Sequence, residues 1–298
     1  MYTENKMIKD KNKAGFTIIE VMVAILIIAL LSSMWFFSNA FLINKSIDAK
    51  VKTFAQSVPV TLSGNFVAYW NFDFCTSGSD ITAFCLRDSW GANGYNGNTS
   101  YVSLSSPAPV VASGTSCVDN NCLVLNGSGN YVIPINQFAI GKNMTLSLWL
   151  KSSDYDNTNG SAPFSMSRGT LATTNYLGFY FHSNVISWCT SDSSCTNFGT
   201  ATYPNSNWHH FLVVNNYNNG SGSIAKLYID GVASGTATYI DTTAVDNTSK
   251  SIVLGYFLGQ ASPYYFNGSI DEVQIFDGAL DISQVKEIYL AGLNNFNK

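Results

Sequence analysis

The stretch Met-Thr-Leu-Ser-Leu-Trp-Leu-Lys at residues 144–151 places an apolar residue at every second position. Successive side chains of a β-strand point to opposite faces of the sheet, so this alternation predicts a strand with one face in a hydrophobic core. Further alternating or aromatic-rich runs occur on both sides of it, at Phe66–Phe72, Asn130–Ile135, Tyr176–Phe181, Trp208–Val214, Ala225–Asp230, Ser251–Tyr256 and Ile270–Phe276. This part of the chain is therefore predicted to be an all-β domain.

Glycine- and asparagine-rich turns separate these runs. Residues 126–130 read Asn-Gly-Ser-Gly-Asn, residues 218–222 read Asn-Asn-Gly-Ser-Gly, and Asp230-Gly231 is a typical hairpin turn. Many short strands joined by such turns indicate a β-sandwich. One helix is expected after the strands, at Ile282–Leu293, with Asp281 or Ser283 as its N-cap.

The composition argues against one class of partner. Only 11% of the 298 residues are charged, and the formal net charge is −4. Binding to nucleic-acid phosphates needs clustered Lys and Arg side chains. We therefore expect no nucleic-acid partner.

A long apolar segment begins at residues 16–31, which read Phe-Thr-Ile-Ile-Glu-Val-Met-Val-Ala-Ile-Leu-Ile-Ile-Ala-Leu-Leu. About 20 apolar residues span a bilayer as a helix, so this segment can anchor the chain in a membrane. No Pro or Gly occurs between residues 16 and 57, and Pro59 then ends the helical pattern. We expect one helix over residues 16–57, roughly 63 Å long at about 1.5 Å per residue.

A cleaved secretory signal peptide and a plain membrane anchor share this composition. Glu20 argues against both, because a carboxylate in an apolar membrane helix costs about 2.5–3.5 kcal/mol at the helix centre, and less near an end. Neither kind of segment has a use for such a residue.

The string Lys-Ala-Gly-Phe-Thr-Ile-Ile-Glu at residues 13–20 resembles the processing site of type IV pilins and pseudopilins. The resemblance implies that a prepilin peptidase cuts after Gly15 and methylates the new N-terminal residue, Phe16. It also implies insertion into the inner membrane and then assembly into a homo-oligomeric helical filament outside the cell. Glu20 would neutralise the N-terminal ammonium of a neighbouring subunit there. We divide the chain into a cleaved leader at residues 1–15, a helix at 16–57, a linker at 58–65 and a β-sandwich at 66–298.

Segments of the β region are similar, in order along the chain, to the laminin-G-like jelly rolls of the concanavalin A type. These segments are Ala68–Asp73, Asp88–Gly97, Leu125–Val132, Met144–Lys151, Trp208–His210, Tyr228–Gly231 and Asn267–Phe276. The resemblance implies a jelly-roll sandwich with a short C-terminal helix, and binding of a glycan or another surface ligand. Candidates for stacking on sugar rings are Trp90, Tyr95, Trp188, Tyr264 and Tyr265. Such sandwiches also use aromatic residues in the core, so both interpretations stay open.

This family often holds a structural calcium ion in its loops, and Asp73, Asp88, Asn93 and Asp271 occupy the corresponding loops. Carboxylate and amide oxygens are the ligands that calcium prefers. The alternative is that these side chains bind their own backbone in turns. Both interpretations stay open.

Catalysis is not expected. Glycan hydrolases need two neighbouring carboxylates, but Asp119 is the only acid between Trp90 and Ser153. The Gly-x-Ser-x-Gly elbow of serine hydrolases does not occur in the sequence. His209 and His210 are adjacent and would point to opposite faces of a strand, so we expect a structural role rather than a shared metal ion.

All six cysteines follow the apolar segment, and none has the C-x-x-C spacing of a zinc ribbon or redox motif. Their spacing suggests three short disulfide loops, although other pairings and free buried thiols stay open. The suggested pairs are Cys75 with Cys85, Cys117 with Cys122, and Cys189 with Cys195. Oxidised pairs imply an oxidising environment outside the cytoplasm.

These features together predict a type IV pilin-like subunit of a surface filament that carries a lectin-like domain for adhesion. A pseudopilin of a secretion or DNA-uptake system is one alternative. A carbohydrate-binding module that is merely tethered to the membrane is the other.

Overall fold

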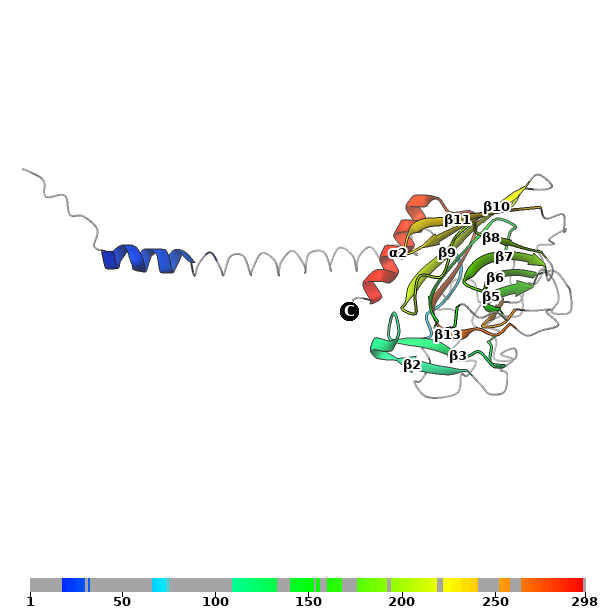
Figure 1. Ribbon diagram of the computed structural model, residues 1–298, viewed down its shortest axis with the longest axis horizontal. Helices are drawn as coiled ribbons and strands as arrows, with labels where there is room; N and C mark the ends of the chain where they lie inside the picture. Colours follow the sequence, from blue (N-terminus) through cyan, green and yellow to red (C-terminus); the bar gives the residue numbers. More distant parts are fainter. Residues whose placement is uncertain are drawn as a thin grey trace, which may run out of the picture. The chain divides into compact units, whose positions relative to one another are not determined.

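A computed structural model of the chain divides it into two compact units, residues 1–50 and 51–298 (Figure 1). The residues that the structure describes are 18–29, 32, 66–73, 75, 109–132, 140–152, 154–155, 160–167, 176–191, 194–218, 222–240, 252–257 and 264–296. Gly15 and Phe16, and most of the predicted 16–57 helix, lie outside them.

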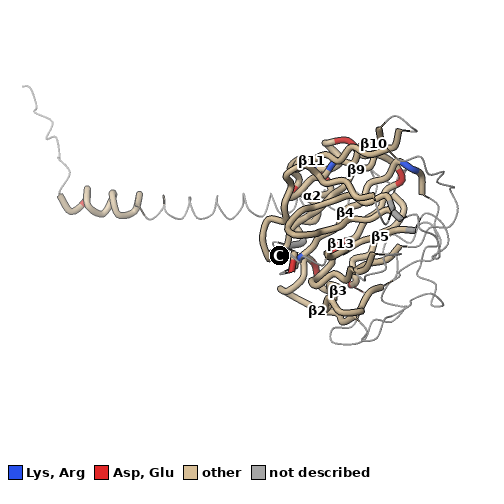
Figure 2. Tube along the Cα trace, turned by 45° about the vertical axis from the view of Figure 1, so that its right-hand side comes forward, with Lys and Arg blue, Asp and Glu red and all other residues tan. Residues whose placement is uncertain are grey.

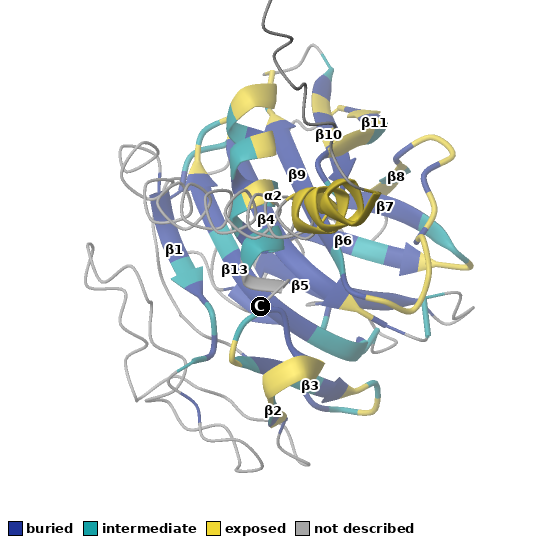
Figure 3. Ribbon diagram, turned by 90° about the vertical axis from the view of Figure 1, so that its left-hand side faces the viewer, coloured by how far each residue is buried: buried dark blue, intermediate teal, exposed yellow. Residues whose placement is uncertain are grey.

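The first unit contains a helix at residues 18–29, as the sequence predicts. All of its side chains are exposed, including Ile18 at 82% and Leu26 at 62% (Figure 3). No helix among the described residues is both long enough and apolar enough to cross a membrane.

The second unit is a sandwich of two antiparallel sheets, which confirms the predicted fold class. The larger sheet has eight strands in the order β11-β10-β9-β4-β13-β3-β2, with β1 also paired to β13. These strands are β1 (Phe66–Trp70), β2 (Val110–Ser113), β3 (Asn121–Asn126), β4 (Met144–Lys151), β9 (His209–Asn216), β10 (Ser223–Ile229), β11 (Val232–Tyr239) and β13 (Asn267–Asp277).

The smaller sheet has five strands in the order β12-β5-β6-β7-β8. They are β5 (Ser161–Ser167), β6 (Tyr176–His182), β7 (Val185–Ser191), β8 (Ser194–Asn197) and β12 (Ile252–Leu254). The main hydrophobic core combines side chains of both sheets, among them Leu148 of β4 and Phe179 of β6. Alternate positions of these strands supply that core, because side chains alternate between the two faces of a sheet.

Strand β4 is buried at every position except its last, Lys151. One face, with Leu146 and Leu148, belongs to the core between the sheets. Thr145, Ser147 and Trp149 lie on the opposite face and are also buried. The second face is buried because helix α2 (Ile282–Phe296) packs against the outside of the larger sheet.

Helix α2 has Asp281 as its N-cap, one of the two predicted residues, and Gln284 completes a capping box. The Asp281 carboxylate accepts hydrogen bonds from the backbone N–H groups of Ser283 and Gln284, and the Gln284 side chain accepts one from the Asp281 N–H. Val285 and Ile288 are buried against Phe276 and other residues of the larger sheet. The cap and the apolar stripe together fix where the helix starts and which face it buries.

The predicted hairpin at Asp230-Gly231 joins β10 to β11. Ile229 pairs with Val232, and both turn residues have positive φ, 50° for Asp230 and 73° for Gly231. These are the backbone angles that a two-residue hairpin turn requires. The predicted strand at Asn130–Ile135 is reduced, among its described residues, to a single bridge between Val132 and Leu254.

Candidate functional site

The 18–29 helix is the candidate assembly segment. Its apolar side chains are exposed all round, from Val21 at 46% to Ile18 at 82%. A helix that is apolar on every side is normally buried in a membrane or among other helices. Glu20 lies within this exposed segment. The segment therefore presents both the surface and the carboxylate that helix-mediated assembly needs.

Disulfides close two short loops, at the pairs that the spacing suggests. Cys117 is bonded to Cys122 and Cys189 to Cys195. Cys189 and Cys195 also face each other across β7 and β8, so this bond clamps the hairpin. Cys75 is disulfide-bonded as well, and Cys85, its expected partner, lies outside the described residues.

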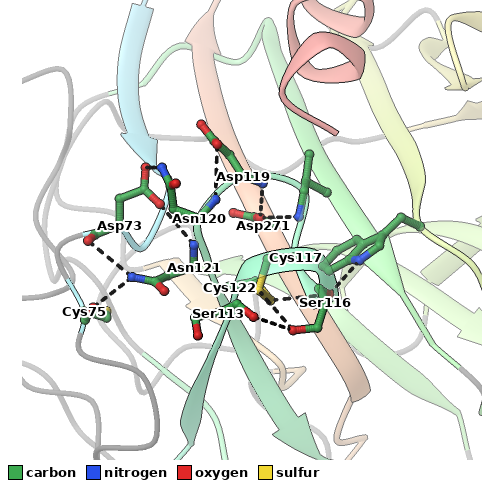
Figure 4. Close-up of a disulfide and its surroundings, with 12 residues drawn as sticks. Asp73, Cys75, Ser113, Ser116, Cys117, Asp119, Asn120, Asn121, Cys122 and Asp271 are labelled. Carbon is green, nitrogen blue, oxygen red and sulfur yellow. Dashed lines mark hydrogen bonds between the residues drawn. A yellow bond between two sulfur atoms is a disulfide. The ribbon is translucent and has the colours of Figure 1, made fainter. Parts of the chain in front are cut away.

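Asp271 holds the Cys117–Cys122 loop against β13 (Figure 4). Its carboxylate accepts backbone N–H groups from Val118 at 3.0 Å, from Asp119 at 3.2 Å and from Glu272 at 2.8 Å. Asp271 is fully buried. Burial raises the pKa of Asp271, and repulsion from the neighbouring Glu272 raises it further.

Asp73 binds the far side of the same loop (Figure 4). One of its carboxylate oxygens accepts the Asn121 backbone N–H, and the other accepts side-chain N–H groups of Asn71 and Asn120. Asp73 and Asp271 therefore tie the disulfide loop to two segments that are far apart in sequence, the turn that follows β1 and strand β13.

Both carboxylates thus act as acceptors for N–H groups. Every oxygen of Asp73 and Asp271 accepts at least one such bond, and a cation would compete with these donors. No cluster of three His, Cys, Asp or Glu side chains suited to a metal occurs among the described residues. Asp88 and Asn93 lie outside them, so the calcium site stays a prediction.

His209 and His210 point to opposite faces of β9. His209 Nδ1 lies 2.7 Å from Asp230 Oδ2, whereas His210 Nε2 lies 2.8 Å from Ser147 Oγ. The His210 ring is fully buried near Trp149, and burial lowers its pKa to about 3. The two rings do not meet at one ion.

The Ser147–His210 pair is buried inside the described part of the fold. Both residues are buried under helix α2, whose Tyr289 ring lies 5.6 Å from that of His210. Asp230 bonds to the other histidine, His209. The buried pair Asp271 and Glu272 accepts hydrogen bonds from Val118, Asp119 and Tyr69. These contacts make the groups structural supports.

The aromatic candidates separate into three groups. Trp188 is completely buried in the core between the sheets, so of the two interpretations it is the core one that holds for this residue. Trp90 and Tyr95 lie outside the described residues. Tyr264 and Tyr265 are half-buried, and they join a larger group of rings on the outer face of the smaller sheet.

We call this group the tyrosine cluster; its rings are Tyr131, Tyr180, Tyr256, Tyr264 and Tyr265. Tyr131, Tyr256 and Tyr265 stack on one another, and Tyr180 meets Tyr264 edge to face at 5.1 Å. The rings cover Ala162, Cys189, Val253 and Phe257, which are buried. The sequence did not indicate Tyr131, Tyr180 or Tyr256, because the cluster forms only when three distant segments meet.

No Lys, Arg, Asp or Glu occurs in strands β5, β6, β7, β8 or β12. The same is true of the described residues that flank the tyrosine cluster, 160–167, 252–257 and 264–270. Charged residues of the described chain lie on other elements (Figure 2). The smaller sheet therefore presents aromatic rings and uncharged polar groups.

Comparisons with known proteins follow the same division of the chain. Residues 10–36 match the prokaryotic N-terminal methylation motif. Residues 125–286 match the concanavalin A-like lectin/glucanases superfamily. No curated protein matches the chain as a whole or in part.

Several solved structures share the fold. Domain 4 of AbnA, an extracellular GH43 arabinanase from Geobacillus stearothermophilus solved with arabinotriose, has 22% identity and a TM-score of 0.53, covering 75% of this chain and 98% of its own. The binding domain of botulinum neurotoxin serotype D has 16% identity and a TM-score of 0.51, covering 77% of this chain and 52% of its own. The binding domain of Paraclostridial Mosquitocidal Protein 1 has 15% identity and a TM-score of 0.50, covering 76% of this chain and 52% of its own.

The present chain thus spans about half the length of these toxin domains, and at such low identity the likeness concerns the fold alone. The family match extends over more than half of the chain. The chain therefore belongs to the concanavalin A-like lectin/glucanases superfamily and carries a prokaryotic N-terminal methylation motif ahead of that domain.

Proposed function

We propose that this protein is a type IV pilin-like subunit of a surface filament, and that its sandwich domain attaches the filament to glycans. The observation that carries the assembly part is the exposed apolar helix at residues 18–29, with Glu20 inside it, within the methylation motif at residues 10–36. The sandwich has a closed core of its own and does not need this helix to bury its apolar side chains.

Processing after Gly15 would leave Phe16 as the first residue and keep the apolar helix in the mature protein. The new ammonium group would then lie next to hydrocarbon, where an unpaired charge is costly. Glu20 of a neighbouring subunit, displaced along the filament axis, supplies the opposite charge. This pairing would set the axial register of the filament, as a buried polar residue sets the register of a coiled coil.

The binding part of the proposal is supported by the family and by the chemistry of the smaller sheet. The name of the superfamily refers to lectins and glucanases, and a structurally similar domain was solved in complex with arabinotriose. The described acidic pair, Asp271 and Glu272, is buried and engaged in hydrogen bonds, which favours binding over hydrolysis. Disulfides on the sandwich suit a domain displayed outside the cell.

The test is Glu20→Ala in cells that express the full chain, with Glu287→Ala as the matched control. Glu287 is a carboxylate on α2, in the other unit of the chain. We expect Glu20→Ala to insert into the membrane and to be processed, but to yield no sheared filaments, whereas Glu287→Ala yields normal amounts.

Other outcomes separate the alternatives. An unchanged filament yield in Glu20→Ala would refute assembly through this carboxylate. If the unaltered chain stays in the membrane and never occurs in sheared filaments, it is a tethered binding module or a pseudopilin. Loss of secretion or DNA uptake on deletion then identifies a pseudopilin.

A further inference from the structure

Three rings of the tyrosine cluster have a defined mutual arrangement. The centroids of Tyr131 and Tyr256 are 5.2 Å apart, those of Tyr256 and Tyr265 are 5.0 Å apart, and those of Tyr131 and Tyr265 are 6.5 Å apart. The planes of Tyr131 and Tyr265 differ by 17°, and Tyr256 is within 29° of both.

These distances form a triangle, so the three parallel rings are not a column. Two nearly parallel rings whose centroids are only about 5 Å apart cannot lie side by side in one plane, because their edges would collide. One ring must lie above the plane of the other. Tyr256 therefore stacks against both Tyr131 and Tyr265. Tyr131 and Tyr265 are also nearly parallel, with a longer separation of 6.5 Å between their centroids, and Tyr256 contacts both rings.

The backbone fixes this arrangement. Tyr256 and Tyr265 face each other in an antiparallel bridge, and Val132, next to Tyr131, pairs with Leu254 at the end of β12. Beneath the cluster, Phe257 fills the space over Gly178 of β6, where any larger residue would collide with its ring. The Cys189–Cys195 disulfide holds the sheet below. The rings are therefore positioned before any ligand arrives, which lowers the entropy cost of binding.

The chemistry of this surface selects a class of ligand. Each of the three rings is partly exposed. A tyrosine ring combines an apolar face, which attracts the slightly positive C–H groups of a sugar ring, with a hydroxyl group that hydrogen-bonds to water or sugar hydroxyls. No charged side chain occurs among the described residues 160–167, 252–257 and 264–270 around the cluster, so none of these residues offsets the desolvation of an anionic sugar.

We propose that Tyr131, Tyr256 and Tyr265 form the platform on which the sandwich binds a neutral oligosaccharide, with two neighbouring sugar rings stacked on Tyr131 and Tyr265. This proposal rests on the glycan-binding part of the proposed function and names its site and ligand class. Tyr180 and Tyr264 extend the same aromatic surface across β6.

The test measures binding of the full chain to neutral and anionic oligosaccharides. The chain is purified in a polyoxyethylene detergent, because a sugar-headed detergent would compete. The probes are arabinotriose, cellotriose and a sulfated trisaccharide, measured by calorimetry and by saturation-transfer NMR. The variants are Tyr131→Ala, Tyr265→Ala and Tyr265→Phe. Tyr217→Ala is the control, because Tyr217 is a half-buried tyrosine beside Lys142 on the other sheet.

We expect at least one neutral trisaccharide to bind and the sulfated one to bind more weakly. Removing either platform ring should weaken binding about tenfold, which is the loss of one ring-stacking interaction. Tyr265→Phe keeps the ring and should retain most of the affinity, and Tyr217→Ala should bind normally. Melting curves of all variants verify that the sandwich is folded.

Three results overturn the proposal, and they can be told apart. If the unaltered chain binds a neutral trisaccharide and the ring variants bind it equally well, the glycan site lies elsewhere and the proposed function stands. The same holds if only the sulfated trisaccharide binds. If the unaltered chain binds no oligosaccharide, the glycan-binding part of the proposed function fails together with the platform, and the surface is left as a protein contact.

Discussion

The substitution Asp271→Asn changes one oxygen of a buried carboxylate into an NH₂ group. In the native protein the two oxygens accept three backbone N–H groups, from Val118, Asp119 and Glu272. Asn offers a single oxygen. Its NH₂ group must face at least one of these N–H donors, so the Cys117–Cys122 loop loses part of its attachment to β13.

The size of the effect follows from this geometry. A hydrogen bond to a charged acceptor contributes about 1.5–3 kcal/mol, and a buried N–H group left without an acceptor costs about 1–3 kcal/mol. Relief of the repulsion between Asp271 and Glu272, which helps to raise the pKa of Asp271, offsets a part of this loss. We expect the free energy of unfolding to fall by about 2–3 kcal/mol. In a domain of this size that lowers the melting temperature by about 4–12 °C.

Urea and thermal denaturation followed by circular dichroism measure this loss, and hydrogen exchange at the Val118 and Asp119 amides reports the loop itself. Asp277→Asn is the matched control. Asp277 is exposed and accepts one N–H group, from Gly141, which an Asn oxygen can still accept. The proposed role of Asp271 is refuted if Asp271→Asn lowers the free energy of unfolding no more than Asp277→Asn does. It is also refuted if hydrogen exchange at the Val118 and Asp119 amides is unchanged.

His210 is buried and uncharged, with a pKa lowered to about 3, so unfolding at acid pH is favoured by its protonation in the unfolded chain. The free energy of unfolding should fall as the pH drops from 6.5 toward 3, by about 3 kcal/mol at pH 4.5. Urea titrations at several pH values should show a smaller fall for His210→Gln. The same fall in both proteins would contradict this. Calcium binding through Asp73, Asp88, Asn93 and Asp271 is tested by the melting temperature after chelation. A rise on adding calcium, absent in Asp73→Ala, confirms it, and an unchanged melting temperature refutes it.

Much of the sandwich could be predicted because its central strands carry a local pattern. Met144–Lys151 was predicted with the bounds that the structure gives to β4, and the Asp230-Gly231 turn was predicted from two residues. Strand β8 (Ser194–Asn197) has no such pattern, since it is short, polar and mostly exposed. It becomes a strand through pairing with β7 and through the Cys189–Cys195 bond.

The candidate sites also differ in whether they depend on neighbouring or on distant residues. The processing site and Glu20 are read from eight consecutive residues, 13–20, so no knowledge of the fold is needed. The tyrosine cluster combines Tyr131, Tyr180 and the pair Tyr264 and Tyr265, whose positions span more than 130 residues. The role of Trp188 could not be predicted either. An aromatic residue in a strand stacks on a ligand or fills the core depending on the face that it occupies, and Trp188 is buried in the core.

The sequence by itself determined the N-terminal methylation motif with its apolar helix, the β-sandwich class and the cysteine spacing. These are local properties, because periodicity, turn chemistry and short motifs depend on neighbouring residues. Only the tertiary structure decided that Asp271 supports a loop 153 residues away, that His210 is sealed under α2, and that three tyrosines form one surface. The physical reason is that burial and contact depend on which strands pair and what covers each face, and that pairing is not local in the chain.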